Sequence, residues 1–276
     1  MLVMIKGAGD IASGIALRLW RAGINVVMTD LPKPSSIRRT VCFSEAVYRG
    51  ETKVEEVRAR LAANAADALR LLEENILPVI VDPKAESAKE LRPDVIVDAI
   101  LAKENLGTAI TDAPGVIGVG PGFTAGTDCH AVVETMRGHT LGRVIWSGSA
   151  VPNTGVPGNI GGYTIERVMH SPCAGEFRAL RQIGDTVEAG VAAVGGEPLC
   201  AKITGTLRGI LPEGFYVPRK GFKSADVDPR CRLFHCFTAS DKALAVGGGV
   251  LEAVLMLTSA VGTARKPEKR GEDYGK

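Results

Sequence analysis

The first thirty residues carry the pattern that most restricts how this chain can fold. Two short apolar segments, residues 2–5 and 25–29, flank the sequence Lys6-Gly7-Ala8-Gly9-Asp10-Ile11-Ala12, and the second segment ends at Asp30. The apolar residues between the glycines and the second segment recur at helical spacing. Strand, G-x-G-x-x-A turn, helix, strand and acidic residue follow one another as in the Rossmann dinucleotide-binding unit.

This unit predicts a phosphate-bearing ligand at the amino-terminal turn. Gly7, Gly9 and Ala12 permit a tight turn and the close approach of a pyrophosphate, and Asp30 is placed to bind a ribose hydroxyl. Asp10 belongs to the same candidate ligand-binding set, although a carboxylate repels phosphate. The alternative interpretation is a Rossmann-like fold whose turn binds nothing or is filled by another part of the chain.

Further apolar runs predict that this unit extends into a larger sheet. Strands are expected at residues 78–82, 94–100, 116–119 and 143–146, with a short helix at 84–91. Apolar runs without alternating polar residues are typical of parallel strands that are buried on both faces. Residues 51–75 fit a helical period, although Asn64 is placed to cap a shorter helix. The predicted fold class is therefore α/β, with a Rossmann-like doubly wound parallel sheet in residues 1–165.

A second glycine-rich turn, at residues 119–127, follows one of these strands and precedes apolar residues at helical spacing from Ala131. Because a strand, a glycine turn and a helix direct backbone N–H groups at an anion, we expect a ligand site here too, the alternative being a plain connection between strand and helix. The candidate ligand-binding residues of this turn and of the neighbouring strand end are Gly120, Gly122, Phe123, Thr124, Asp98 and Lys103. Since parallel sheets bind ligands beyond the carboxyl ends of their strands, we predict that both turns meet in one cleft.

The segment that follows the second turn contains three candidates for acid–base chemistry. His130 has a pKa range that suits proton transfer, and Glu134 lies one helical turn beyond it, so that both share a face. Asp128 is the third candidate catalytic residue. Two of them have a structural alternative, since Asp128 is equally placed to cap a helix and His130 to cap or support one.

A glycine- and proline-rich stretch and a repeat follow. Residues 149–165 contain the candidate ligand-binding residue Asn153 and are interpreted either as an ordered loop, such as a lid, or as a linker. The repeat, at an offset of about thirty residues, looks like the two halves of the barrel-sandwich hybrid of biotinyl and lipoyl carrier domains, and predicts a small β module at residues 166–225. No lysine lies between Gly190 and Cys200, so the module is interpreted as an inserted platform rather than a carrier.

The remaining residues and the composition limit the class of protein. Residues 226–262 are predicted to return as helix onto the first domain, and residues 263–276 to form a disordered tail. A net charge of +2 over 276 residues provides no polybasic surface for nucleic acid, and no apolar run is long enough to span a membrane. Six cysteines without C-x-x-C spacing favour reduced thiols and a cytoplasmic location. No metal site is predicted, and homo-oligomerisation is left open.

Several motifs together resemble the YqeB-like proteins. They are Gly7-Ala8-Gly9-Asp10, Ile37-Arg38-Arg39-Thr40-Val41, Asp98-Ala99-Ile100-Leu101-Ala102-Lys103, Gly120-Pro121-Gly122-Phe123, Pro152-Asn153-Thr154-Gly155, Asp241-Lys242 and Gly247-Gly248-Gly249-Val250-Leu251-Glu252. The resemblance extends to about residue 255. It implies a bacterial accessory protein of the selenium-dependent molybdenum hydroxylase system, with the hydroxylase or its cofactor-assembly proteins as partners, and it supplies no reaction.

Three hypotheses about function follow from these observations. The first is a maturation factor whose Rossmann-like cleft binds a nucleotide or a phosphorylated or dinucleotide form of the molybdenum cofactor. The second is an NAD(P)-dependent oxidoreductase, for which no hydride-transfer motif is present. The third is a non-enzymatic chaperone or scaffold that docks the hydroxylase through its β module. Whether the protein is an enzyme stays open at this point.

Overall fold

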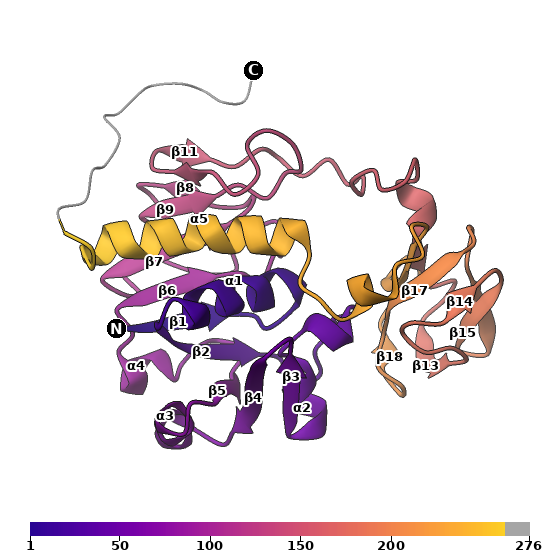
Figure 1. Ribbon diagram of the computed structural model, residues 1–276, viewed down its shortest axis with the longest axis horizontal. Coiled ribbons are helices and arrows are strands. Elements are labelled where there is room, and N and C mark those ends of the chain that lie inside the picture. The colour runs from indigo at the N-terminus through magenta and orange to yellow at the C-terminus, as the bar shows by residue number, and fades with distance from the viewer. Residues whose placement is uncertain (263–276) are drawn as a thin grey trace.

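A nine-stranded, mostly parallel sheet forms the larger part of the molecule in this computed structural model, which describes residues 1–262 (Figure 1). Its strand order is β10-β9-β7-β6-β1-β2-β5-β4-β3. The strands are β1 (Leu2–Lys6), β2 (Asn25–Asp30), β3 (Glu51–Val54), β4 (Val57–Ala62), β5 (Leu77–Val81), β6 (Val95–Asp98), β7 (Gly115–Val119), β9 (Ala131–Val133) and β10 (Val144–Ile145). Only the outer pairs β3–β4 and β9–β10 are antiparallel. The predicted α/β class with a parallel sheet is therefore confirmed.

Helices cover both faces of this sheet, which explains why its strands are apolar throughout. Val3 and Ile5 of β1 lie in one core with α1 (Asp10–Arg21) and α5 (Asp241–Thr258). Met4, between them, lies in a second core with α3 (Ala65–Glu73) and α4 (Ala88–Leu91). Two short helices, η1 (Arg39–Val41) and α2 (Glu45–Arg49), follow β2 along the chain. The amino-terminal strand, helix and strand lie where the sequence predicts them.

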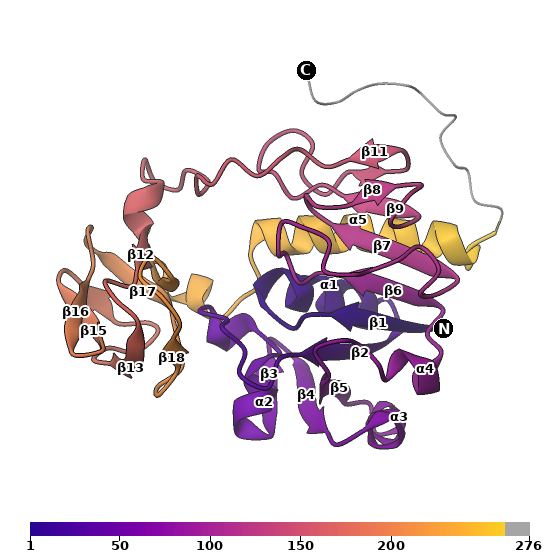
Figure 2. The same ribbon diagram turned by 180° about the vertical axis from the view of Figure 1, so that it is seen from behind.

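The last helix crosses the first at close range because small residues meet at the contact. A Cβ atom on Gly14 of α1 would lie 2.6 Å from Cβ of Ala243, and one on Gly247 would lie 2.7 Å from the carbonyl oxygen of Gly14. This crossing brings the start of α5 next to the start of α1 (Figures 1 and 2).

A small β module lies to one side of the large sheet (Figure 2). It consists of two antiparallel four-stranded sheets, ordered β12-β19-β17-β14 and β16-β15-β13-β18. The strands are β12 (Val168–His170), β13 (Gly175–Ala179), β14 (Thr186–Val187), β15 (Gly190–Val194), β16 (Glu197–Cys200), β17 (Gly205–Ile210), β18 (Tyr216–Val217) and β19 (Lys223–Asp228). Ile210 N donates to Ile37 O at 2.7 Å and Arg39 Nε donates to Ile210 O at 3.0 Å, so β17 is hydrogen-bonded to the first part of the chain.

Two connections join the module to the sheet. Residues 150–165 form an irregular strap that leads into η2 (Ile165–Arg167), and the chain returns through η3 (Leu233–Cys236) to α5 (Figure 1). A separate two-stranded ribbon, β8 (Thr124–Ala125) with β11 (Gly148–Ser149), lies beyond β9.

Two predicted helices are strands. Residues 51–62 form the hairpin β3–β4, and only the shorter helix capped by Asn64, whose side chain accepts a hydrogen bond from Asp67 N, is present. Residues 131–133 form β9, which pairs with β7, so the second glycine turn leads into a strand rather than a helix. The predicted disordered tail, residues 263–276, lies outside the described residues.

Candidate functional site

A cleft of about 1030 Å³ lies where the β module faces the carboxyl ends of the central strands. The sheet side contributes the turn after β1, the end of β2 and the loop after β6. The other walls come from the strap, from β12 and β19 of the module, and from the start of α5. Of the predicted ligand-binding residues, the cleft is lined by Gly7, Gly9, Asp10, Ala12, Asp30, Lys103 and Asn153.

The two glycines of the amino-terminal turn have different roles. Gly7 has a φ of +95°, and a Cβ atom there would lie 3.1 Å from Ala99 O, so the fold itself requires glycine at this position. Gly9 has an ordinary extended backbone, and a Cβ atom there would lie 3.2 Å from its nearest neighbour, Ser36 Oγ. Gly9 thus keeps the cleft wall open without being needed for the turn.

Asp30 at the end of β2 binds the turn itself. Its Oδ2 accepts a hydrogen bond from Ala8 N at 3.0 Å, and its Oδ1 accepts one from Leu31 N at 2.7 Å. Burial raises the pKa of Asp30, and these two backbone donors oppose that shift. The carboxylate therefore holds the glycine turn in place and also lines the cleft.

The unfavourable charge of Asp10 is offset by Arg38. The Arg38 Nη1 lies 3.1 Å from both carboxylate oxygens of Asp10, and its Nη2 donates to His235 O at 2.8 Å. Arg38 is only 6% exposed, and its Nε has no hydrogen-bond partner among the described residues. A phosphate at the start of α1 would therefore meet a neutral ion pair rather than an isolated carboxylate.

Lys103 and Asn153 meet across the cleft from the loop after β6 and from the strap. With the side-chain amide of Asn153 oriented to satisfy both groups, its oxygen accepts hydrogen bonds from Lys103 Nζ and from Gly155 N, each at 3.3 Å. Lys103 has a φ of +71° and Leu101 one of +61°, a conformation that is uncommon outside glycine and that is found at functional sites.

The cleft as a whole is basic. Its lining includes eight lysine and arginine residues against four aspartates and no glutamate. The basic residues are Arg38, Lys103, Arg137, Arg167, Arg208, Arg219, Lys223 and Lys242. Such an excess, in a concave site with low-dielectric walls, attracts an anionic ligand.

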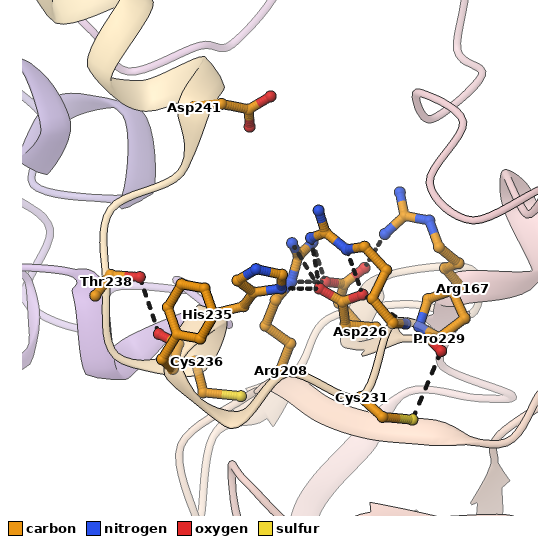
Figure 3. A network of polar contacts seen from close by, with 12 residues as sticks. Arg167, Arg208, Asp226, Pro229, Cys231, His235, Cys236, Thr238 and Asp241 are labelled. Atoms are coloured by element: carbon orange, nitrogen blue, oxygen red, sulfur yellow. Dashed lines mark hydrogen bonds and ion pairs between the residues drawn. The ribbon is translucent and has the colours of Figure 1, made fainter.

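A buried network of charges forms the module side of the cleft (Figure 3). Asp226, 3% exposed, accepts hydrogen bonds from Arg167 at 3.1 Å and from Arg208 at 2.5 and 2.8 Å. Arg167 is 4% exposed, burial lowers its pKa, and its Nε has no partner in residues 1–262. These three residues line the cleft, and no motif in the sequence singles them out.

Asp228 extends this network away from the cleft. It lies 2.7 Å from Arg230 Nη2, 3.6 Å from Arg208 Nη1 and 3.3 Å from His235 Nδ1. Burial raises the pKa of Asp228, but hydrogen bonds from Arg230 and the charge of Arg208 outweigh burial and bring it well below its usual range. Asp228 is thus an anion at neutral pH that holds three basic side chains around it.

The second glycine turn does not reach the cleft, because another segment covers it. A Cβ atom on Gly122 would lie 2.7 Å from the backbone of Glu104, and one on Gly120 would lie 2.8 Å from Thr135 Oγ1. Phe123 is buried against Gly118. These glycines therefore permit close packing, and the structure does not bring the two turns together in one site.

The three candidate catalytic residues and Thr124 also lie outside the cleft lining. His130 Nδ1 accepts a hydrogen bond from Val116 N at 3.0 Å, and Asp128 Oδ2 accepts one from Thr124 N at 2.8 Å. Glu134, 2% exposed, accepts from three backbone N–H groups at 2.6 to 2.8 Å. Each of these side chains bonds to the backbone, and the acid–base roles predicted for them stay predictions.

Asp98 is likewise buried beneath the cleft rather than part of its lining. It lies 3.2 Å from Lys6 Nζ and accepts a hydrogen bond from Thr108 Oγ1 at 2.6 Å. Lys6 also bonds to Thr108. Asp98 and Thr108 bracket the loop that presents Lys103, so this cluster anchors one wall of the cleft.

Two features are absent from the described part of the chain. In residues 1–262, no three His, Cys, Asp or Glu side chains gather in a way that would hold a metal ion. In the same residues, no helix combines the length and the apolar character needed to cross a bilayer.

Comparisons with known proteins place the chain beside one curated relative. No protein-family model matches the sequence. An aspartoacylase family protein from Mesorhizobium loti MAFF303099, a crystal structure, aligns over 84% of this chain and 86% of its own, at 11% identity and a TM-score of 0.27, which supports no inference. The chain is 54% identical over 258 residues to a protein of Escherichia coli (strain K12) named "Uncharacterized protein YqeB". That match covers 93% of this chain and 48% of the relative, so the chain spans about half the length of that protein. The chain is therefore similar, over most of its length, to about half of that protein, and the likeness assigns it no activity.

Proposed function

We propose that the cleft binds a phosphate-bearing small molecule, either a nucleotide or a phosphorylated or dinucleotide form of the molybdenum cofactor. Through that ligand the protein acts as an accessory or maturation factor for a selenium-dependent molybdenum hydroxylase. The cleft supports the binding of such a ligand, and the YqeB-like resemblance supports the maturation role.

One observation carries the proposal: the Gly7–Gly9 turn at the start of α1 opens onto a cleft with an excess of basic residues. Backbone N–H groups at the start of a helix favour an anion, and Gly9 leaves room for it. A volume of about 1030 Å³ is at the upper end of small-molecule pockets, which suits a ligand as large as a dinucleotide.

The β module supplies the second wall of the cleft in this proposal. Its two antiparallel sheets support the barrel-sandwich-hybrid type that the repeat predicts. Since residues 190–200 contain no lysine, we propose that the module encloses the ligand rather than carrying a covalently attached group.

The proposal is tested by identifying what the protein retains. We expect mass spectrometry of small molecules, released from protein purified without added nucleotide, to find a phosphate-bearing compound. Gly9→Val should reduce the retained amount and weaken binding of that compound at least about tenfold, because the side chain fills the space of the phosphate. Circular dichroism should stay unchanged, since the backbone at Gly9 suits valine. Gly190→Val, in the module and away from the cleft, is the matched control.

Other outcomes favour the rival functions. Substrate-linked oxidation of added NADH would identify an oxidoreductase. If the protein co-purifies with the hydroxylase but binds none of the released compounds, nor NAD⁺, NADP⁺ or ADP, it is a scaffold. That result would contradict the proposal.

A further inference from the structure

Lys242 occupies an unusual place for a cation. It is the second residue of α5, it is half-buried, and it lines the cleft. It forms no ion pair with any residue in the described part of the chain. The start of a helix carries a partial positive charge, which repels a lysine there. The burial of the side chain, the positive end of the helix dipole and the lack of an ion-pair partner in the described residues all disfavour a charge on Lys242.

The groups that face Lys242 do not neutralise it. Burial and the charge of Arg137 lower its pKa, and Lys223 from the module adds to this effect. Two carboxylates act in the opposite direction, Asp10 from α1 and Glu134 after β9. Asp10 is already paired with Arg38, and Glu134 accepts three backbone hydrogen bonds, so neither is available as a full partner.

Helix α1 starts at the same cleft and has no side-chain cap. Gly9 is its N-cap residue, and no side chain in residues 1–262 caps the first turn. Arg38, which is more than nine-tenths buried and lines the cleft beside Asp10, has an Nε without a partner in residues 1–262. Asp241, the first residue of α5, is held by a bidentate pair with Arg137 at 2.7 and 2.9 Å. The two first-turn carboxylates are thus both neutralised by arginine.

We propose that Lys242, together with the starts of α1 and α5, forms the binding site for a diphosphate group of the ligand. This inference rests on the proposed function and adds a residue and a ligand class to it. The ion pairs Asp10–Arg38 and Asp241–Arg137 cancel. Lys242 and the uncapped start of α1, which is worth about half a charge, then leave a net positive charge at this place. A diphosphate bridge of the kind that joins two nucleoside units carries two negative charges.

Titration with inorganic pyrophosphate, at low ionic strength and followed by calorimetry, tests this site. Lys242→Met should weaken binding at least about tenfold, because a charge-assisted hydrogen bond is lost. Lys242→Arg keeps the charge and should stay within about threefold. Lys220→Met, which removes an exposed lysine of the module outside the cleft, should bind as the wild type does.

Two further measurements separate binding from a structural role. The wild-type affinity should fall as the pH rises through the lowered pKa of Lys242, whereas the Lys242→Arg affinity should persist to higher pH. The folded state lowers the pKa of Lys242, so charging it costs stability below its unfolded pKa, and that cost disappears as the pH rises above it. Lys242→Met should therefore retain or raise the midpoint of thermal unfolding at neutral pH.

The outcomes distinguish this inference from the proposed function. If Lys242→Met binds pyrophosphate like the wild type while Gly9→Val does not, the role of Lys242 is overturned and the proposed function stands. If the wild type binds neither pyrophosphate nor the released compounds, NAD⁺, NADP⁺ or ADP, the role of Lys242 and the proposed function are both overturned.

Discussion

The contacts of Glu134 in the structure differ from those that its position in the sequence indicates. In the sequence it follows His130 at a spacing that suits a shared helix face. In the structure it is buried after β9, and its two carboxylate oxygens accept hydrogen bonds from Thr135, Met136 and Val151. The hydrogen bond to Val151 ties the start of the strap to the sheet. Its partners are backbone groups, which no residue pattern reveals.

We expect Glu134→Gln to destabilise the fold. The amide has one acceptor oxygen, so its NH₂ group would face a backbone N–H donor that loses its partner. The free energy of unfolding should fall by about 2–3 kcal/mol, which urea denaturation measures. Glu252→Gln, at an exposed position of α5, is the control and should change little. A variant with unchanged stability and altered ligand binding would instead indicate a functional role for Glu134.

At the scale of helices and strands, the sequence predicts the elements that are specified by residues close together along the chain. The strand–glycine–helix unit at β1, α1 and β2 is specified by adjacent residues, and Asn64 caps α3 as predicted. The hairpin β3–β4 was missed although Val57–Ala62 alternates apolar and basic residues before Ala62, a period of two that indicates a strand. β9 has only three residues, and its pairing with β7 decides its conformation. Such a short apolar run fits helix or strand equally well until its partner is known.

The three consecutive glycines of α5 provide a test of the helix crossing. A Cβ atom on Gly248 would have no atom within 4 Å, so Gly248→Ala should raise the free energy of unfolding by about 0.5–1 kcal/mol through helix propensity. Gly247→Ala should lower it by about 1–3 kcal/mol, because the methyl group would lie 2.7 Å from Gly14 O. Urea denaturation of both variants measures the difference. Equal stabilisation by the two substitutions would contradict the close crossing of α1 and α5.

At the scale of the whole molecule, the cleft is the feature that sequence could specify only in part. The sheet side follows from a known topology, which predicts a site beyond the carboxyl ends of the strands. The module side depends on how two parts with separate hydrophobic cores dock, and Arg167, Arg208 and Asp226 belong to no recognisable motif. The docking also decides which glycine turn is accessible. Residues 101–104 cover the second turn and leave the first one open.

The docking of the module depends on a close approach at Gly209 of β17. A Cβ atom there would lie 3.1 Å from Ile37 O and 3.2 Å from Ile37 Cγ1, beside the hydrogen bond from Ile210 N to Ile37 O. We expect Gly209→Leu to push residues 37–39 away from β17 and to loosen the docking of the module, whose core also includes Ile37. The walls of the cleft then separate, so the radius of gyration from X-ray scattering should increase.

Unfolding of this variant can be followed separately in the two parts. Both tryptophans, Trp20 and Trp146, pack against the core of the large sheet, so their fluorescence reports only that part, whereas far-ultraviolet circular dichroism reports both. In the wild type we expect the two urea transitions to coincide, as they do when parts unfold together. In Gly209→Leu they should separate, because the interface no longer couples the parts. Gly190→Leu, a glycine of β15 with open space around it, is the control and should keep a single transition. Coincident transitions and an unchanged radius of gyration in Gly209→Leu would show that contacts other than β17 hold the module in place.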